Sequence, residues 1–135
     1  MDVIIFSGQS NMQGQSECLT ENDVVNDAYE YKWLTDELLP LKNPVGENIT
    51  YFMDRGDDVT PETNIPSWLK EHALGAACYG NTNLVPSFCR TYTDITKRQV
   101  LAVHAAKGST RISEWLPEAP IYDVLIRKAR RAIQK

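Results

Sequence analysis

The sequence predicts an α/β fold built on a parallel sheet, and three observations support this prediction. Residues Asp2 to Ser7 form a continuous apolar run, "DVIIFS", which is typical of a strand buried on both faces in a parallel sheet. Gln99 to Ala105, "QVLAVHA", has the same character. A helical pattern leads directly into this second strand, as expected of a crossover unit that joins parallel strands.

The helical pattern before the second strand covers "LVPSFCRTYTDIT", residues 84–96. Pro86 suits the first turn of a helix, because an N–H group at that place has no partner within the helix. Phe88, Tyr92 and Ile95 follow the spacing i, i+4, i+7, which predicts that they form the buried face.

A second amphipathic helix is predicted at the C-terminal end, over "APIYDVLIRKARRAIQK". Its predicted apolar face consists of Ile121, Val124, Leu125, Ala129 and Ile133. The basic side chains lie largely on the other face, which we expect to be solvated; they are Arg127, Lys128, Arg130, Arg131 and Lys135. Their position near the helix C-terminus also complements the helix dipole.

The segment between the two strands, from about residue 35 to 83, is rich in Pro, Asn, Gly and Asp and predicts a long, loop-dominated excursion. Its first part, "YKWLTDELLPLKNPVGENI", has enough Trp, Tyr and Leu to be packed. A substrate-binding wall and an inert covering layer are both open interpretations. Trp33 and Trp115 are expected to be packing residues.

Composition narrows the class of protein. The 135 residues suffice for one domain, and no apolar run approaches the roughly 20 residues of a membrane-spanning helix. The net charge of −4 argues against a nucleic-acid partner and favours a neutral or weakly charged small substrate. The start of the chain has no basic leader, which favours the cytoplasm and leaves secretion or the periplasm open. Cys18, Cys78 and Cys89 lack CxxC spacing, so we expect reduced structural thiols and no metal site.

The stretch "FSGQSNMQG" follows the first strand and carries Ser10 between Gln9 and Asn11. A sharp turn at the end of a strand can present a nucleophilic serine or cradle a phosphate, since both use exposed backbone N–H groups. The stretch lacks the Lys of a P-loop and the GxGxxG spacing. Without other segments, a serine there could also be a simple turn residue.

Several segments together resemble the SGNH hydrolase superfamily, in the form of the sialate O-acetylesterase and plant-type acetylxylan esterase group. "GQSNMQG" is similar to the first block of that group, from Gly8 to Gly14. "YEYKWLTDELLPLKNPVGE", "NLVPSFCRTY" and "AVHAAKGSTRISEWLP" are similar to its later segments, so the resemblance covers essentially the whole chain.

The resemblance implies a three-layer α/β/α fold of flavodoxin-like type and a serine esterase that removes acetyl groups from sugars of the sialic acid or xylan type, without a cofactor. Ser10 would be the nucleophile, and its backbone N–H would be one oxyanion donor. Asn83 aligns with the position of the second donor. The expected substrate-binding residues are Gln9, Asn11, Lys107 and Ser109. Lys107, Ser109, Thr110 and Arg111 form a polar loop that could line the sugar site or simply close over the first strand.

The sequence also departs from this group. A Gln-Gly-Glu block and a terminal Asp-x-x-His, which would supply the general base, are absent from these residues. We expect His104 to be a buried, hydrogen-bonded histidine rather than a substitute base, and His72 to be at the surface. We therefore expect residues 1–135 to be the N-terminal part of a single esterase domain, completed by a missing C-terminal half or by self-association. The alternative function is a non-catalytic, phosphate-binding or flavin-binding module.

Overall fold

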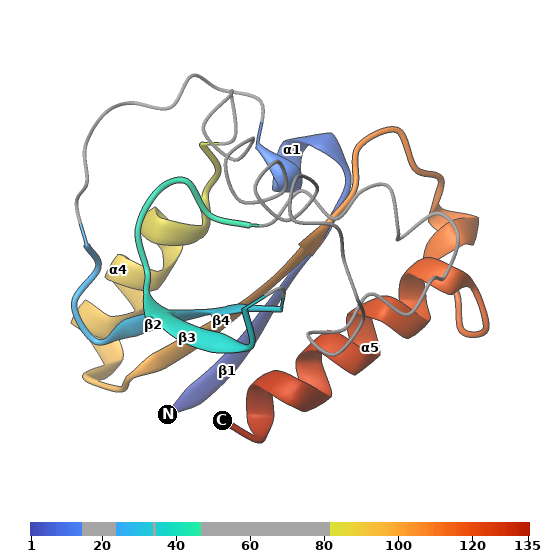
Figure 1. The fold of residues 1–135 in the computed structure, drawn as a ribbon. Helices are drawn as coiled ribbons and strands as arrows, with labels where there is room; N and C mark the ends of the chain where they lie inside the picture. Colours follow the sequence, from blue (N-terminus) through green and yellow to red (C-terminus); the bar gives the residue numbers. More distant parts are fainter. Residues whose placement is uncertain (15–23, 34, 47–81) are drawn as a thin grey trace.

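The computed structural model describes residues 1–14, 24–33, 35–46 and 82–135, which form an α/β fold (Figure 1). In chain order the elements are β1 (Asp2–Gly8), α1 (Ser10–Gln13), β2 (Ala28–Lys32), β3 (Glu37–Pro40), α4 (Val85–Thr96), β4 (Val100–Ala106), the 3-10 helix η2 (Ile112–Trp115) and α5 (Pro120–Ile133). The described strands form one sheet in the order β1-β4-β2-β3. The predicted α/β class is confirmed, with β3 as an antiparallel strand on an otherwise parallel sheet.

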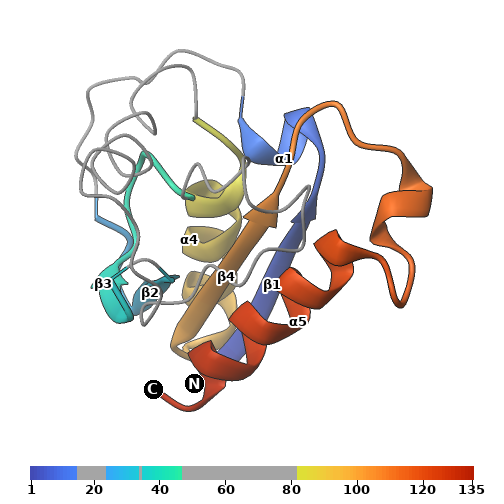
Figure 2. The same cartoon turned by 45° about the vertical axis from the view of Figure 1, so that its right-hand side comes forward.

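Strand β4 is the centre of the sheet and is buried along its whole length. It pairs in parallel with β1 from Asp2 opposite Val100 to Gly8 opposite Ala106, and with β2 from Ala28 opposite Val100. The carboxyl ends of β1 and β4 therefore meet at the same edge of the sheet. In Figure 2 this edge carries both α1 and the loop that follows β4.

Two helices cover opposite faces of the sheet, which makes three layers (Figures 1 and 2). Alternate residues of β4 point to the two faces, because side chains alternate along a strand. The cluster under α4 consists of Phe6, Val25, Ala28, Leu41, Val45, Val85, Cys89, Val100 and Ala102. The cluster under α5 consists of Tyr31, Trp33, Leu101, Val103, Ala105, Ile121, Val124, Ala129 and Ala132.

Strand β1 is not buried on both faces, and this part of the prediction is wrong. Val3 is 38% exposed and Ile5 is 46% exposed, whereas Phe6 is buried. Among the described residues β1 has a sheet neighbour on one side only, and none of its side chains belongs to the cluster under α5. A continuous apolar run thus identifies a strand without showing how many of its faces are covered.

The predicted buried face of α4 is wrong at Phe88 and Ile95, whereas Tyr92 packs partly against the core. The buried residues of this helix are Val85, Pro86, Cys89 and Thr93, while Phe88 is 44% exposed and Ile95 is 76% exposed. The helix is rotated so that Phe88 lies beside the sheet and meets the Phe6 ring edge-on, at 5.4 Å between centroids. Pro86 does stand in the first turn, as predicted.

Helix α5 differs from its prediction at one apolar residue and at one basic residue. Ile133 is 65% exposed, while Lys128 is fully buried and donates a hydrogen bond from Nζ to the His104 carbonyl oxygen at 2.8 Å. Lys128 follows Ile121 by seven residues, so it lies on the face that packs on the sheet. A long side chain that reaches a buried carbonyl can occupy such a position, and sequence periodicity does not reveal this partner.

The first part of the predicted loop region is packed, as expected, and includes a hairpin between β2 and β3. Tyr31, Trp33, Leu41 and Val45 are all buried. Residues 47–81, which include His72 and Cys78, and residues 15–23, which include Cys18, lie outside the described ranges. Every helix in the described part of the chain is too short or too polar to span a membrane.

The turn between β2 and β3 is tied to the end of α5. Asp36 accepts hydrogen bonds from the Tyr31 hydroxyl at 2.7 Å and from Lys135 Nζ at 2.5 Å. The hydrogen bond from Lys135, with a smaller effect of Tyr31, lowers the pKa of the Asp36 carboxyl. The stabilisation from these bonds is present above the ordinary carboxyl pKa and is lost as the pH falls through the lowered one.

The Cys89 thiol is expected to resist alkylation in the folded protein. Burial raises its pKa to about 12 from an ordinary 9.0, which reduces the thiolate fraction at neutral pH by about a thousandfold. Peptide-resolved mass spectrometry after iodoacetamide treatment should show Cys89 labelled only after unfolding. Rapid labelling of Cys89 in the folded chain would contradict its burial.

Candidate active site

The turn between β1 and α1 places Ser10 at the first position of a short helix, at the carboxyl end of β1. The N–H groups of Met12 and Gln13 donate to the Gln9 carbonyl at 3.0 and 2.8 Å. A Cβ atom at Gly8 would lie 3.1 Å from the Met12 Cβ, so glycine is the residue that lets the helix fold back this closely on the strand.

The start of α1 offers backbone donors beside the Ser10 side chain. The N–H groups of Ser10 and Asn11 have no acceptor within the helix, because the first residues of any helix lack one. The Ser10 side chain is partly buried, and those of Gln9 and Asn11 are exposed. The geometry expected of a serine presented at a strand end is therefore present.

The loop after β4 lies directly against this turn. The Lys107 N–H donates to the Gly8 carbonyl at 2.9 Å, and the Gly108 N–H donates to Gln13 Oε1 at 2.7 Å. A Cβ atom at Gly108 would lie 3.8 Å from the Ser10 Cβ. Lys107 is buried, whereas Ser109 is exposed with φ +62°. The structure thus brings the polar loop to Ser10, as the parallel sheet predicts.

A cavity of about 380 Å³ flanks the turn on the side of α5. Its lining residues are Ser7, Gly8, Gln9, Thr110, Arg111, Ile112, Trp115, Tyr122 and Leu125. Gln9 is the one expected substrate-binding residue among them; Asn11, Lys107 and Ser109 are not. Trp115 packs partly against the core under α5 and donates from Nε1 to Thr110 Oγ1 at 2.9 Å.

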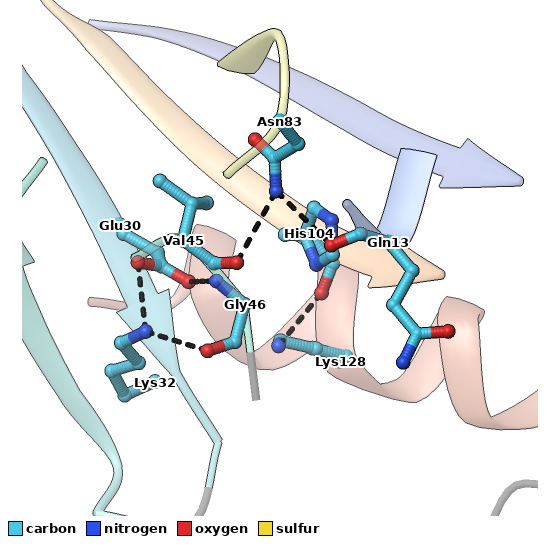
Figure 3. Close-up of polar contacts among 8 residues, drawn as sticks. All are labelled: Gln13, Glu30, Lys32, Val45, Gly46, Asn83, His104 and Lys128. Atoms are coloured by element: carbon cyan, nitrogen blue, oxygen red, sulfur yellow. Dashed lines mark hydrogen bonds and ion pairs between the residues drawn. The ribbon is translucent and has the colours of Figure 1, made fainter. Parts of the chain in front are cut away.

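Asn83 links α1 to the start of α4 through its side chain (Figure 3). Its Nδ2 group donates to the carbonyl oxygens of Gln13, at 3.4 Å, and of Val45, at 3.3 Å. Its Oδ1 atom accepts the Val85 N–H at 3.1 Å. This anchoring by the side chain is independent of the backbone N–H of Asn83, whose role as an oxyanion donor stays a prediction.

His104 is a buried, hydrogen-bonded residue, as expected. It is 3% exposed, and its Nε2–H donates to the Met12 carbonyl at 2.8 Å. In this arrangement Nε2 carries a proton and cannot accept one from Ser10. The other ring nitrogen faces Gly46, since a Cβ atom there would lie 2.6 Å from His104 Nδ1. The structure therefore favours a supporting role for His104 over that of a general base.

Glu30 and Lys32 support the site, and sequence analysis missed them. Glu30 is 2% exposed and accepts the Gly46 N–H at 2.8 Å. Lys32 pairs with Glu30 Oε2 at 2.8 Å and donates to the Gly46 carbonyl at 3.0 Å, as Figure 3 shows. The signal in the sequence was the glutamate between two tyrosines in "AYEYK". Buried charges of this kind need a partner.

Comparison with known proteins gives the family. The family described as carbohydrate esterase, sialic acid-specific acetylesterase, matches residues 1–135. The chain belongs to this family of carbohydrate esterases. No curated protein matches it significantly.

In the part of the chain that is described, no group of three or more His, Cys, Asp or Glu could hold a metal ion.

A solved structure of the same fold extends this comparison. The chain is similar to the crystal structure of an Arabidopsis thaliana protein, with 14% sequence identity and a TM-score of 0.66. The match covers 96% of this chain and 50% of the plant protein. At this identity the likeness shows the fold, and the chain spans about half the length of the structure that it matches.

Gly46→Ala is expected to destabilise the protein by about 1–3 kcal/mol, because φ is +103° there and the new Cβ would meet the His104 ring. Gly108→Ala is the matched control. Its new Cβ would lie 2.9 Å from Gln13 Oε1, the end of a flexible side chain that can move at the cost of one hydrogen bond. Urea denaturation should show the larger loss for Gly46→Ala; equal losses would contradict the rigid contact.

Asn83→Asp is expected to lower the free energy of unfolding by about 1–3 kcal/mol, because the two Nδ2–H bonds are lost and a carboxylate faces two carbonyl oxygens. The acceptor for the Val85 N–H is kept. Asn26→Asp, at an exposed position, is the control and should unfold at the wild-type urea concentration. The proposed anchoring is wrong if the two variants have the same stability.

Proposed function

We propose that this chain is the nucleophile-bearing part of a carbohydrate O-acetylesterase, with Ser10 as the nucleophile. The observation that carries the proposal is the position of Ser10, which opens α1 at the carboxyl end of β1 with the loop after β4 packed against it. Membership of a carbohydrate-esterase family over residues 1–135 supports the same reaction class.

In this proposal Ser10 Oγ attacks the acetyl carbon and forms a tetrahedral oxyanion. The backbone N–H of Ser10 donates to that oxyanion, and the backbone N–H of Asn83 is the candidate second donor. The sugar hydroxyl then leaves with a proton, and water hydrolyses the acetyl-Ser10 intermediate. The chemistry needs no cofactor.

In this proposal the general base comes from outside the described residues. His104 is held at Nε2 by the Met12 carbonyl, and His72 lies in a range that is not described. The chain spans half of the similar plant structure, so a further segment or a second copy is the proposed source of the base. Without a base, a serine hydroxyl is a weak nucleophile at neutral pH.

The proposed substrate is an acetylated sugar of the sialic acid or xylan type. The amide and hydroxyl groups of Gln9, Asn11 and Ser109, and the amine of Lys107, would bind its hydroxyl groups. The cavity beside Gln9 adds the aromatic side chains of Trp115 and Tyr122, which suit the apolar faces of a sugar ring.

With the base supplied by a second copy, Ser10→Ala is expected to abolish hydrolysis of 4-nitrophenyl acetate above the background rate, and intact-mass measurement of the wild type should detect one acetyl group on Ser10. Ser87→Ala, at an exposed position on α4, is the control and should keep the wild-type rate. Equal rates for wild type and Ser10→Ala in folded samples would contradict catalysis by this chain alone. Bound flavin absorbance would instead favour a cofactor-binding module.

A further inference from the structure

Gln13, the last residue of α1, joins the turn at Ser10 to two other segments. Its side-chain Oε1 atom accepts the Gly108 N–H at 2.7 Å, and its carbonyl oxygen accepts Asn83 Nδ2 at 3.4 Å. Figure 3 shows the Gln13 side chain extending away from Asn83, so the two contacts lie on different sides of the residue. The backbone and the side chain of Gln13 therefore make separate connections.

The loop that Gln13 contacts makes other hydrogen bonds, one to β1 and one within the loop itself. The Lys107 N–H donates to the Gly8 carbonyl at 2.9 Å, and Thr110 Oγ1 donates to the Lys107 carbonyl at 2.9 Å. Between these points the backbone turns through Ser109, with φ +62°. The bond from Gly108 to Gln13 is a contact of this loop that lies next to Ser10.

Gly108 is close enough to Ser10 for its position to matter. A Cβ atom on Gly108 would lie 2.9 Å from Gln13 Oε1, 3.8 Å from the Ser10 Cβ and 3.9 Å from the Ser10 Cα. The loop backbone therefore forms a wall beside Ser10. A small displacement of groups around a reacting atom can reduce the rate strongly, because the reaction needs a narrow range of geometry.

We propose that Gln13 is a positioning residue, which holds the Lys107–Thr110 loop against Ser10 by accepting the Gly108 N–H. This role rests on the proposed function, because it assumes that Ser10 is the nucleophile. Gln13 does not touch the reacting atoms in this arrangement and acts through Gly108. This role requires a hydrogen-bond acceptor oxygen at the end of a side chain as long as that of Gln13.

Two substitutions separate the acceptor from the shape of the side chain. Gln13→Met keeps a similar length and volume without the oxygen acceptor, whereas Gln13→Glu keeps an oxygen at the same place. Gln99→Met is the matched control, because Gln99 is exposed just before β4 and its Nε2 lies 3.5 Å from Asp27 Oδ1.

Amide hydrogen exchange at Gly108 measures the bond itself. Exchange is expected to be about tenfold faster in Gln13→Met and near the wild-type rate in Gln13→Glu and Gln99→Met, since one hydrogen bond of ordinary net strength is lost. Unchanged exchange in Gln13→Met would overturn the proposal.

Ester hydrolysis measures the consequence for Ser10. In Gln13→Met, kcat for Ser10-dependent hydrolysis of 4-nitrophenyl acetate is expected to fall about tenfold, with KM and Tm changed little. A wild-type kcat in Gln13→Met would overturn the positioning role even if exchange at Gly108 were faster.

The two readouts distinguish this proposal from the proposed function. If the wild type shows no Ser10-dependent hydrolysis, the proposed function of this chain alone fails. Amide exchange at Gly108 then tests the hydrogen bond independently of catalysis. Faster exchange in Gln13→Met but not in Gln13→Glu supports Gln13 as the residue that holds the loop. Equal exchange in all variants overturns this role.

Discussion

The hydrogen bond from His104 Nε2 to the Met12 carbonyl, 2.8 Å long, connects the central strand of the sheet to the short helix that begins at Ser10. The carbonyl oxygen of the same histidine accepts the buried Lys128 amine at 2.8 Å, so one residue of β4 contacts both α1 and α5. A four-residue helix has little stability of its own, because helix formation needs several turns to offset nucleation. Contacts with β4 and its neighbours hold α1 in place.

Buried polar groups around this bond form a connected set. Glu30 and Lys32 bind both backbone groups of Gly46, and the absence of a side chain at Gly46 leaves room for the His104 ring. Asn83 binds the last carbonyl of α1 on another side. A buried polar group costs stability unless it is paired, so these residues depend on one another. The position of Ser10 is in this way a property of several strands and loops.

This chain contributes several groups to the proposed reaction and requires one that it does not supply among its described residues. It contributes the serine, backbone N–H groups at the start of α1, and the polar loop after β4 with its neighbouring cavity. It requires a general base. His104 Nε2 donates to the Met12 carbonyl, so this nitrogen cannot accept the proton of Ser10.

Local sequence patterns predicted β1, α4, β4 and α5, the turn at Ser10 and the meeting of two strand ends, because periodicity and glycine positions are local properties. Which helix faces are buried became known from the fold: Ile95 is exposed and Lys128 is buried, against the prediction. The tertiary structure also decided the roles of Glu30 and Gln13, whose partners Gly46 and Gly108 are far away in the chain. Burial and hydrogen-bond partners depend on neighbours that only folding brings together, so a local pattern does not contain them.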